Sequence, residues 1–196
     1  MLFLTDFADQ AVVLPVMLLV AAALALFGWW RGALAWLVGV GGTLGVMLVL
    51  KLVFRACGDL LPRVDLHNPS GHTAAAAVTY GGLVALLGAS GGSALATALG
   101  AAAVFGFSRV ALGVHTPPEV LLGGAVGLAG VALLVRLAGR PPPVRQRNFG
   151  LVAVCLAGLL VFHGTHVEAE TAIGRLARLL DVWPLAACKA DISYPG

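Results

Sequence analysis

Charged residues are scarce in this chain of 196 residues. Lysine, arginine, aspartate and glutamate make up 11% of it and hydrophobic residues 60%, whereas soluble domains carry about a quarter charged residues. With only three cysteines, the chain lacks the disulfide framework of small secreted domains. It also has no basic run and no basic patch interleaved with aromatic residues, so despite the net charge of +3 we expect no nucleic-acid partner. What is abundant is apolar sequence, which indicates an integral membrane protein.

The apolar sequence is divided into six runs that contain no charged residue. A spanning helix needs roughly 17 to 25 residues including its flanks, so we predict an all-α bundle of six transmembrane helices, the last two short. Asp6 and Asp9 stand where a signal peptide would be basic, so the first run should stay in the membrane. The six runs are Ala11–Trp30, Gly32–Leu50, Thr73–Ala89, Gly91–Phe107, Val120–Val135 and Phe149–Phe162.

The segment after Phe162 has a different pattern. Its apolar residues recur at helical spacing opposite Arg175 and Arg178, which predicts an amphipathic helix lying in the membrane interface. The alternative is a loosely ordered terminus in which Pro184 ends a short helix. We therefore expect one membrane domain over residues 1–164 and an interfacial segment over 165–196. The apolar positions of that segment are Ile173, Leu176, Leu179, Leu180 and Trp183.

Alternating helices would separate the charges between the two membrane faces. All nine acidic residues fall on one face, together with both termini and the segments Lys51–His72 and Arg109–Glu119. Short loops rich in arginine and lysine stay in the cytoplasm, so the acidic face should point outward. The opposite face receives Arg31, Arg136, Arg140, Arg145 and Arg147.

The cysteines allow two interpretations. Cys57 and Cys188 would both lie on the outer face, where an oxidising compartment permits a bridge between them. The alternative is that both remain free buried thiols. Cys155 lies inside an apolar run, where it is most simply a small packing residue. In the second run, Gly41 and Gly45 have the spacing that lets two helices approach closely.

Helix length places two polar motifs at the same membrane face. Between His72 and Ser108 the chain has a glycine-rich turn near its middle. The roughly 18 residues on each side of this turn would form a helix about 27 Å long at about 1.5 Å per residue, close to the thickness of one bilayer core. Lys51 ends the second helix on that face and His115 precedes the fifth. Because ionisable residues at membrane depth are costly to keep there, this cluster is a candidate functional site.

The residue types in this cluster suit a phosphate. The third helix opens at Ser70, and the first N–H groups of a helix bind anions readily. Ser70 can cap the helix or donate to a phosphate oxygen, although an ordinary cap beside an incidental histidine is the simpler alternative. Lys51 and Arg109 add permanent positive charge. Basic residues at helix ends also commonly extend toward lipid headgroups without binding a substrate.

Glu119 has two candidate roles. Thr116, Pro117 and Glu119 match a helix start in which the glutamate completes a capping box. Alternatively, Glu119 hydrogen-bonds one nitrogen of His115 and fixes its tautomer, so that the other nitrogen can attack. The two roles can be shared. His163 and His166 have a spacing that could suit a metal, but without a carboxylate or cysteine partner we predict no metal there.

These motifs resemble a known family. Pro69–His72 reads Pro-Ser-Gly-His, and the stretch from Ser108 to His115 reads Ser-Arg, five residues, His. Both strings are the catalytic pattern of the membrane-bound type 2 phosphatidic acid phosphatases, which is shared with vanadium haloperoxidases. The resemblance spans roughly Val12–Val135.

The resemblance implies a role for each matched residue. His115 would be the nucleophile that forms a phosphohistidine, oriented by Glu119, and His72 would protonate the leaving group. No metal or cofactor is implied. The residues expected to hold the phosphoryl oxygens are Lys51, Ser70, Gly71 and Arg109.

The chain departs from the family pattern in three ways. Glu119 stands where the family has aspartate. The family's lysine is followed after six residues by Arg-Pro, but here Gly58 stands seven positions after Lys51, which leaves Arg55 and Arg63 as candidates for the missing arginine. Two predicted helices precede Pro-Ser-Gly-His rather than three, and one is added at the end.

The expected function is that of a metal-independent lipid phosphatase. Its substrate would be a polyprenyl diphosphate, phosphatidate, phosphatidylglycerophosphate or lipid A phosphate, embedded among membrane lipids. We expect it in a bacterial inner (plasma) membrane, with its site on the periplasmic side. One alternative is transfer of the phosphoryl group to another acceptor. A second is a transporter or a non-catalytic membrane scaffold, although the helices lack the buried charges typical of ion pathways.

Overall fold

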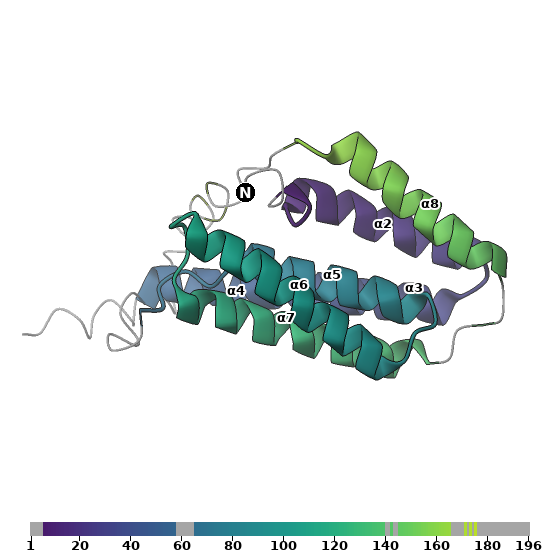
Figure 1. The fold of residues 1–196 in the computed structure, drawn as a ribbon, viewed down its shortest axis with the longest axis horizontal. Coiled ribbons are helices and arrows are strands. Elements are labelled where there is room, and N and C mark those ends of the chain that lie inside the picture. The colour runs from purple at the N-terminus through teal and green to yellow at the C-terminus, as the bar shows by residue number, and fades with distance from the viewer. Residues whose placement is uncertain are drawn as a thin grey trace, which may run out of the picture.

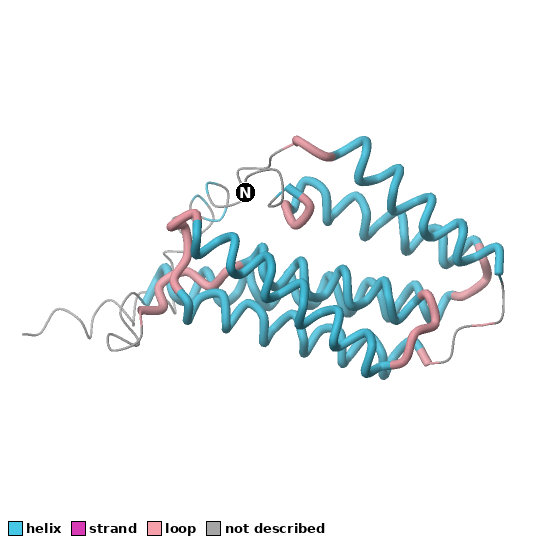
Figure 2. The backbone as a smooth tube through the Cα atoms, in the orientation of Figure 1, coloured by secondary structure: helices cyan, strands magenta, loops and turns pink. Residues whose placement is uncertain are grey.

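The structure is a computed structural model, and it describes residues 6–57, 65–139 and 145–165, with the isolated positions 142, 171, 173 and 175. Within these ranges every regular element is a helix and there is no strand (Figures 1 and 2). The predicted all-α class is confirmed. In chain order the elements are α2 (Gln10–Leu26), α3 (Trp30–Trp36), η1 (Leu37–Gly41), α4 (Gly42–Cys57), α5 (Gly71–Leu86), α6 (Gly91–Ala111), α7 (Pro117–Ala138) and α8 (Arg145–Phe162).

The elements form six rods, because α3, the π-helical turn η1 and α4 follow one another without a break. Three rods are long and apolar enough to cross a membrane: Trp30–Phe54 with 25 residues, Gly91–Ala111 with 21 and Pro117–Ala138 with 22. Two shorter apolar helices, Gln10–Leu26 and Asn148–Phe162, accompany them. The predicted interfacial helix falls almost wholly outside the described residues, as does Cys188.

Helix α5 lies at the centre of the bundle and packs against α6 and α7 (Figure 1). Its residues from Ala74 to Val78 are completely buried. The small side chains of α5 and glycines of α7 make this contact possible. A Cβ placed at Gly127 would lie 2.6 Å from Ala77 Cβ and 2.7 Å from the Ala74 carbonyl oxygen. Any larger residue at Gly127 would therefore push the two helices apart.

The close helix approach falls elsewhere than the spacing of Gly41 and Gly45 predicts. A Cβ at Gly45 would meet nothing within 4 Å, and one at Gly41 would touch only Met17 Sδ, at 3.8 Å. Gly39 makes the close contact instead, because a Cβ there would lie 2.9 Å from Leu134 Cβ. Gly39 lies inside the π-helical turn η1, two residues before Gly41.

Helices α2 and α8 pack side by side on one flank of the bundle (Figure 1). The indole Nε1 of Trp36 donates a hydrogen bond of 2.9 Å to the carbonyl of Met17, which fastens α2 to the rod that begins with α3. Leu18 is 61% exposed and Leu160, on α8, 82% exposed. Large apolar side chains on an outer surface are expected where lipid replaces water as the solvent.

The two ends of the bundle differ in chemistry. At one end, Arg31 Nε donates to the Leu137 carbonyl at 2.7 Å, and Asn148 donates to the Leu87 carbonyl at 3.2 Å. At the other end, the last turns of α4 and α6 meet the first turns of α5 and α7 (Figure 1). The motif residues lie at this second end.

Candidate active site

His115 is held in the short connection between α6 and α7. Helix α6 ends at Ala111 with Leu112 as its C-cap residue, and the next residue, Gly113, takes a φ of +67°. The Gly113 N–H bonds to the Val110 carbonyl at 2.9 Å and the Val114 N–H to the Arg109 carbonyl at 3.2 Å. This is the Schellman ending, which favours glycine because other residues are strained at positive φ. It turns the chain sharply enough to place His115 directly before α7.

His115 and Glu119 form a buried pair. The distance from His115 Nδ1 to Glu119 Oε2 is 2.8 Å, and both side chains are almost completely buried. A carboxylate accepts hydrogen bonds, so it favours the tautomer that carries its proton on Nδ1. The Nε2 lone pair is then available to a substrate.

Glu119 also joins the loop before α5 to the start of α7. Its Oε1 accepts backbone N–H bonds from His67, at 3.1 Å, and Asn68, at 2.6 Å. Its Oε2 accepts the Thr116 N–H at 3.2 Å, completing a capping box with that residue. Glu119 therefore caps α7 and contacts His115 at the same time, so the two alternatives suggested by the sequence coexist.

Lys51 reaches the same region from α4. Its side chain is buried, and Nζ donates a hydrogen bond of 2.8 Å to Asn68 Oδ1. A Cβ at Gly71 would lie 3.5 Å from Lys51 Cε, so the lysine lies against the first residue of α5.

Ser70 does not cap α5 with its side chain. Its Oγ accepts a hydrogen bond of 2.9 Å from the Thr73 hydroxyl, and its backbone N–H bonds to the Glu119 carbonyl at 3.1 Å. The serine is fully buried. Within the described part of the chain, the first N–H groups of α5 are thus left without a side-chain cap, which is the arrangement that suits an anion.

His72 follows in the first turn of α5 and has an acidic neighbour. Its Nε2 lies 3.7 Å from Oδ2 of Asp9, the N-cap residue of α2. The sequence did not single out Asp9 for this site, because its position before an apolar run signals only a helix cap. Asn68 was missed as well, since an asparagine before proline is an ordinary turn residue.

Ser108 and Arg109 complete the cluster from the last turn of α6. The Ser108 side chain is buried, and among the described residues its Oγ has no hydrogen-bond partner. The positive charges of Arg109 and Lys51 both act on His115. Burial lowers the pKa of His115 below its ordinary value, these two charges lower it further, and the Glu119 contact opposes the shift. The imidazole is therefore neutral at physiological pH, the form that can attack.

Two candidate arginines and one candidate disulfide lie outside the described part of the chain. Arg55 lies in α4, but its side chain is outside the described part, and Arg63 lies in the undescribed stretch 58–64. The proposed Cys57–Cys188 bridge cannot be placed for the same reason. Across the described ranges, no three His, Cys, Asp or Glu side chains gather as a metal site.

Comparisons with known proteins agree with the motifs. The family model of the PAP2 superfamily matches residues 3–141. An uncharacterized 22.5 kDa protein in the cps region of Klebsiella pneumoniae is 28% identical over 186 residues, covering 87% of each chain. No solved structure matches. The family model covers well over half of the chain and includes every motif residue described above, so this protein belongs to the PAP2 superfamily.

Proposed function

We propose that the protein is a membrane-embedded phosphatase that removes a terminal phosphate from a lipid phosphate or diphosphate. Membership of the PAP2 superfamily suggests phosphatase activity in general. The observation that carries the specific proposal is the buried His115–Glu119 pair. It lies where Lys51, Arg109 and the uncapped start of α5 supply positive charge.

His115 acts as the nucleophile in this proposal. With Nδ1–H donated to Glu119, the Nε2 lone pair attacks phosphorus, and the bond from phosphorus to the leaving oxygen breaks with its electron pair on that oxygen. The product is a phosphohistidine. Glu119 stabilises the positive charge that develops on the ring, as the orienting carboxylate of a catalytic triad does.

The phosphoryl oxygens are held by the surrounding donors. Lys51, Arg109 and the N–H groups at Gly71 and His72 offer fixed positive charge to the equatorial oxygens of the transition state. Ser70 adds a hydroxyl beside them. Such preorganised donors are worth more in a site that excludes water, and the burial of Lys51 and Ser70 provides that environment.

His72 serves as the general acid and then as the general base. It protonates the departing oxygen, and in the second step it takes a proton from the water that cleaves the phosphohistidine. Asp9 is a positioning residue in this proposal, because its carboxylate, 3.7 Å from Nε2, holds that ring nitrogen toward itself. The cycle needs no metal ion.

The proposed substrate is amphipathic, because the site lies at the end of apolar helices, at the level of lipid headgroups. Polyprenyl diphosphate, phosphatidate, phosphatidylglycerophosphate and lipid A phosphate all carry the required group. The charge distribution of the loops favours an inner membrane with this end outside.

The test is phosphate release by the purified protein in detergent, with a chelator present and a panel of these lipids. We expect His115→Ala to abolish release and to abolish trapping of a labelled phosphohistidine. His67→Ala is the matched control, because the exposed His67 side chain lies 3.3 Å from Asp65, and its backbone N–H, which contacts Glu119, is kept in the variant. Full activity of His115→Ala would refute the assigned nucleophile.

A further inference from the structure

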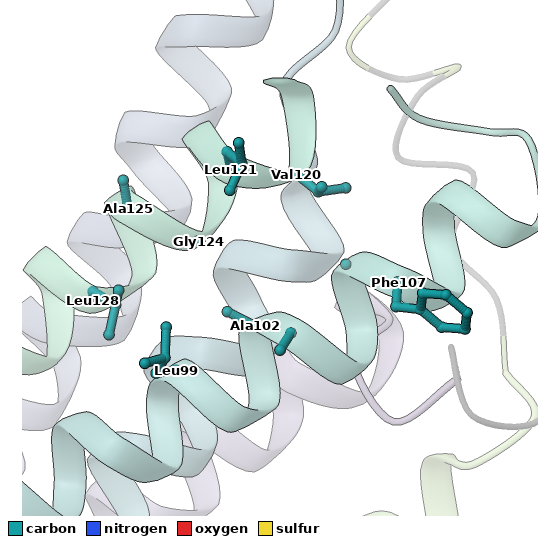
Figure 3. Close-up of a pocket in the computed structure, with 10 residues that line it drawn as sticks. Leu99, Ala102, Phe107, Val120, Leu121, Gly124, Ala125 and Leu128 are labelled. Atoms are coloured by element: carbon teal, nitrogen blue, oxygen red, sulfur yellow. The ribbon is translucent and has the colours of Figure 1, made fainter. Parts of the chain in front are cut away.

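A groove of about 300 Å³ runs between α6 and α7, as Figure 3 shows. Among the described residues, no side chain that lines it carries a polar group, and the walls come from these two helices alone. The lining residues are Leu99, Ala102, Ala103, Gly106, Phe107, Val120, Leu121, Gly124, Ala125 and Leu128.

One end of the groove adjoins the candidate active site. Phe107 directly precedes Ser108, and Val120 directly follows Glu119. The two helices are close here, since a Cβ at Gly106 would lie 3.3 Å from Val120 Cβ. From Val120 the groove follows α7 to Leu128, which is about 12 Å at the helical rise, close to the roughly 15 Å depth of one lipid leaflet.

The floor of the groove separates it from the phosphate-binding residues by one layer of side chains. Gly124 and Gly106 are buried and contribute no side chain to the floor. A Cβ at Gly124 would lie 3.4 Å from Ala102 Cβ and 3.8 Å from Thr73 Cγ2. Thr73 is the residue whose hydroxyl bonds to Ser70. The walls instead project outward, since Leu99, Phe107 and Leu121 are exposed.

We infer that this groove holds a hydrocarbon chain of the lipid substrate while its phosphate lies at His115, an inference that rests on the proposed function. The groove is apolar and its side opens toward the membrane, and the cationic cluster lies at its Val120 end. This arrangement matches a lipid that has an anionic headgroup and a long hydrocarbon chain. The chain would extend toward the bilayer centre, and the groove would select for its length.

A second hollow on the other side of α6 does not fit this role. It is lined by seven residues, including Phe7, Tyr80 and Gly100, and none of them belongs to α7. The hydroxyl of Tyr80 bonds to the Phe7 carbonyl at 3.2 Å. This hollow therefore does not adjoin the helix that carries Glu119.

The test fills the groove and leaves the catalytic residues unchanged. Ala103 on α6 and Ala125 on α7 line the groove and are exposed, so Ala103→Phe and Ala125→Phe should fold. Ala96→Phe and Ala129→Phe are matched controls, because these exposed alanines lie on the same two helices and do not line the groove. Each full-length variant is assayed in mixed micelles with dioleoyl and dihexanoyl phosphatidate.

We expect each groove variant to lose at least tenfold in kcat/KM on the dioleoyl substrate and less than twofold on the dihexanoyl one. Retained short-chain activity also shows that the variant is folded. The controls should match the unmodified protein on both substrates. Equal losses on the two chain lengths, or no loss on dioleoyl phosphatidate, would overturn this inference and leave the proposed function standing. Absence of phosphate release by the unmodified protein from every lipid of the panel would contradict the proposed function itself.

Discussion

At the scale of single residues, Glu119 contributes most to the architecture of the site. One carboxylate accepts four hydrogen bonds, from the backbone of His67, Asn68 and Thr116 and from the ring of His115. These donors come from the segment before α5 and from the start of α7. Glu119 thus joins the two motifs, and the longer glutamate side chain lets one group reach all of them.

This arrangement predicts the effect of Glu119→Gln on the pH profile. The proposed mechanism requires the neutral form of His115, so we expect activity to fall as pH drops through the pKa of that ring. Glu119 raises this pKa against the effect of burial, so removing the carboxylate charge lowers it and moves the acid limb of kcat/KM to lower pH. We also expect kcat to fall about 100-fold or more, because the tautomer is no longer fixed.

The control for that measurement is Glu119→Asp, which restores the charge and the residue type found in the family. It should keep the acid limb close to its original position. An acid limb that moves to higher pH in Glu119→Gln would mean that another group controls it.

Asn68 provides a second residue-scale prediction. Its amide oxygen accepts from Lys51 Nζ at 2.8 Å, and a hydrogen bond to a charged group contributes about 1.5–3 kcal/mol. We expect Asn68→Ala to lower kcat/KM about tenfold or more by loosening Lys51. Steady-state kinetics on a lipid phosphate would check this, with His67→Ala as the neighbouring control. An unchanged kcat/KM would show that Lys51 does not depend on Asn68.

At the scale of elements, the turn between α6 and α7 decides where His115, the proposed nucleophile, lies. Gly113 has a φ of +67°, and a residue with a Cβ pays about 1–2 kcal/mol in this conformation. Since the turn precedes His115 by two residues, Gly113→Ala should lower kcat more than it raises KM. A Cβ there would meet nothing within 4 Å, so Gly113→Asn, which tolerates this φ, should recover most of the activity. Equal effects of alanine and asparagine would exclude the backbone explanation.

The contact between α5 and α7 predicts a difference between two glycines. At Gly127 a leucine side chain would overlap Ala77 and the Ala74 backbone, and overpacking costs typically 1–3 kcal/mol or more. At Gly100 a Cβ would meet nothing within 4 Å. We expect Gly127→Leu to lower the midpoint of thermal unfolding in detergent by several degrees, and Gly100→Leu to leave it nearly unchanged. Equal midpoints would contradict the helix packing described above.

At the scale of the whole molecule, the two ends of the bundle predict its orientation. In a protein freed of its native cysteines, an impermeant maleimide should label Asp65→Cys in intact spheroplasts. Ala89→Cys, at the turn between α5 and α6, should react only after permeabilisation. Both positions are exposed, so the contrast reports membrane side rather than burial. The reverse labelling pattern would place the site in the cytoplasm.

Much of the bundle could be predicted from the sequence because the bilayer requires long apolar runs. The six predicted runs coincide with the six rods, apart from their ends. The start of α7 lies at Pro117 rather than Val120 because the capping box extends it, and α6 continues past Arg109 to Ala111. Apolar periodicity alone does not report such polar helix ends.

Close packing was harder to predict. Glycine spacing pointed to Gly41 and Gly45, whereas the contacts are made by Gly39 and Gly127. Many glycines in this chain have the spacing for close approach, and only the rotation of each helix about its axis selects those that meet a neighbour.

The sequence by itself determined the helical class, the two motifs and their separation by a hairpin about one bilayer long. These properties depend on local composition and spacing, which a linear chain carries in full. Only the tertiary structure decided that Glu119 joins the loop before α5 to His115, that Asp9 lies beside His72, and that an apolar groove adjoins the site. Each of these depends on residues far apart in the chain, and their distances are set by how the helices rotate and pack.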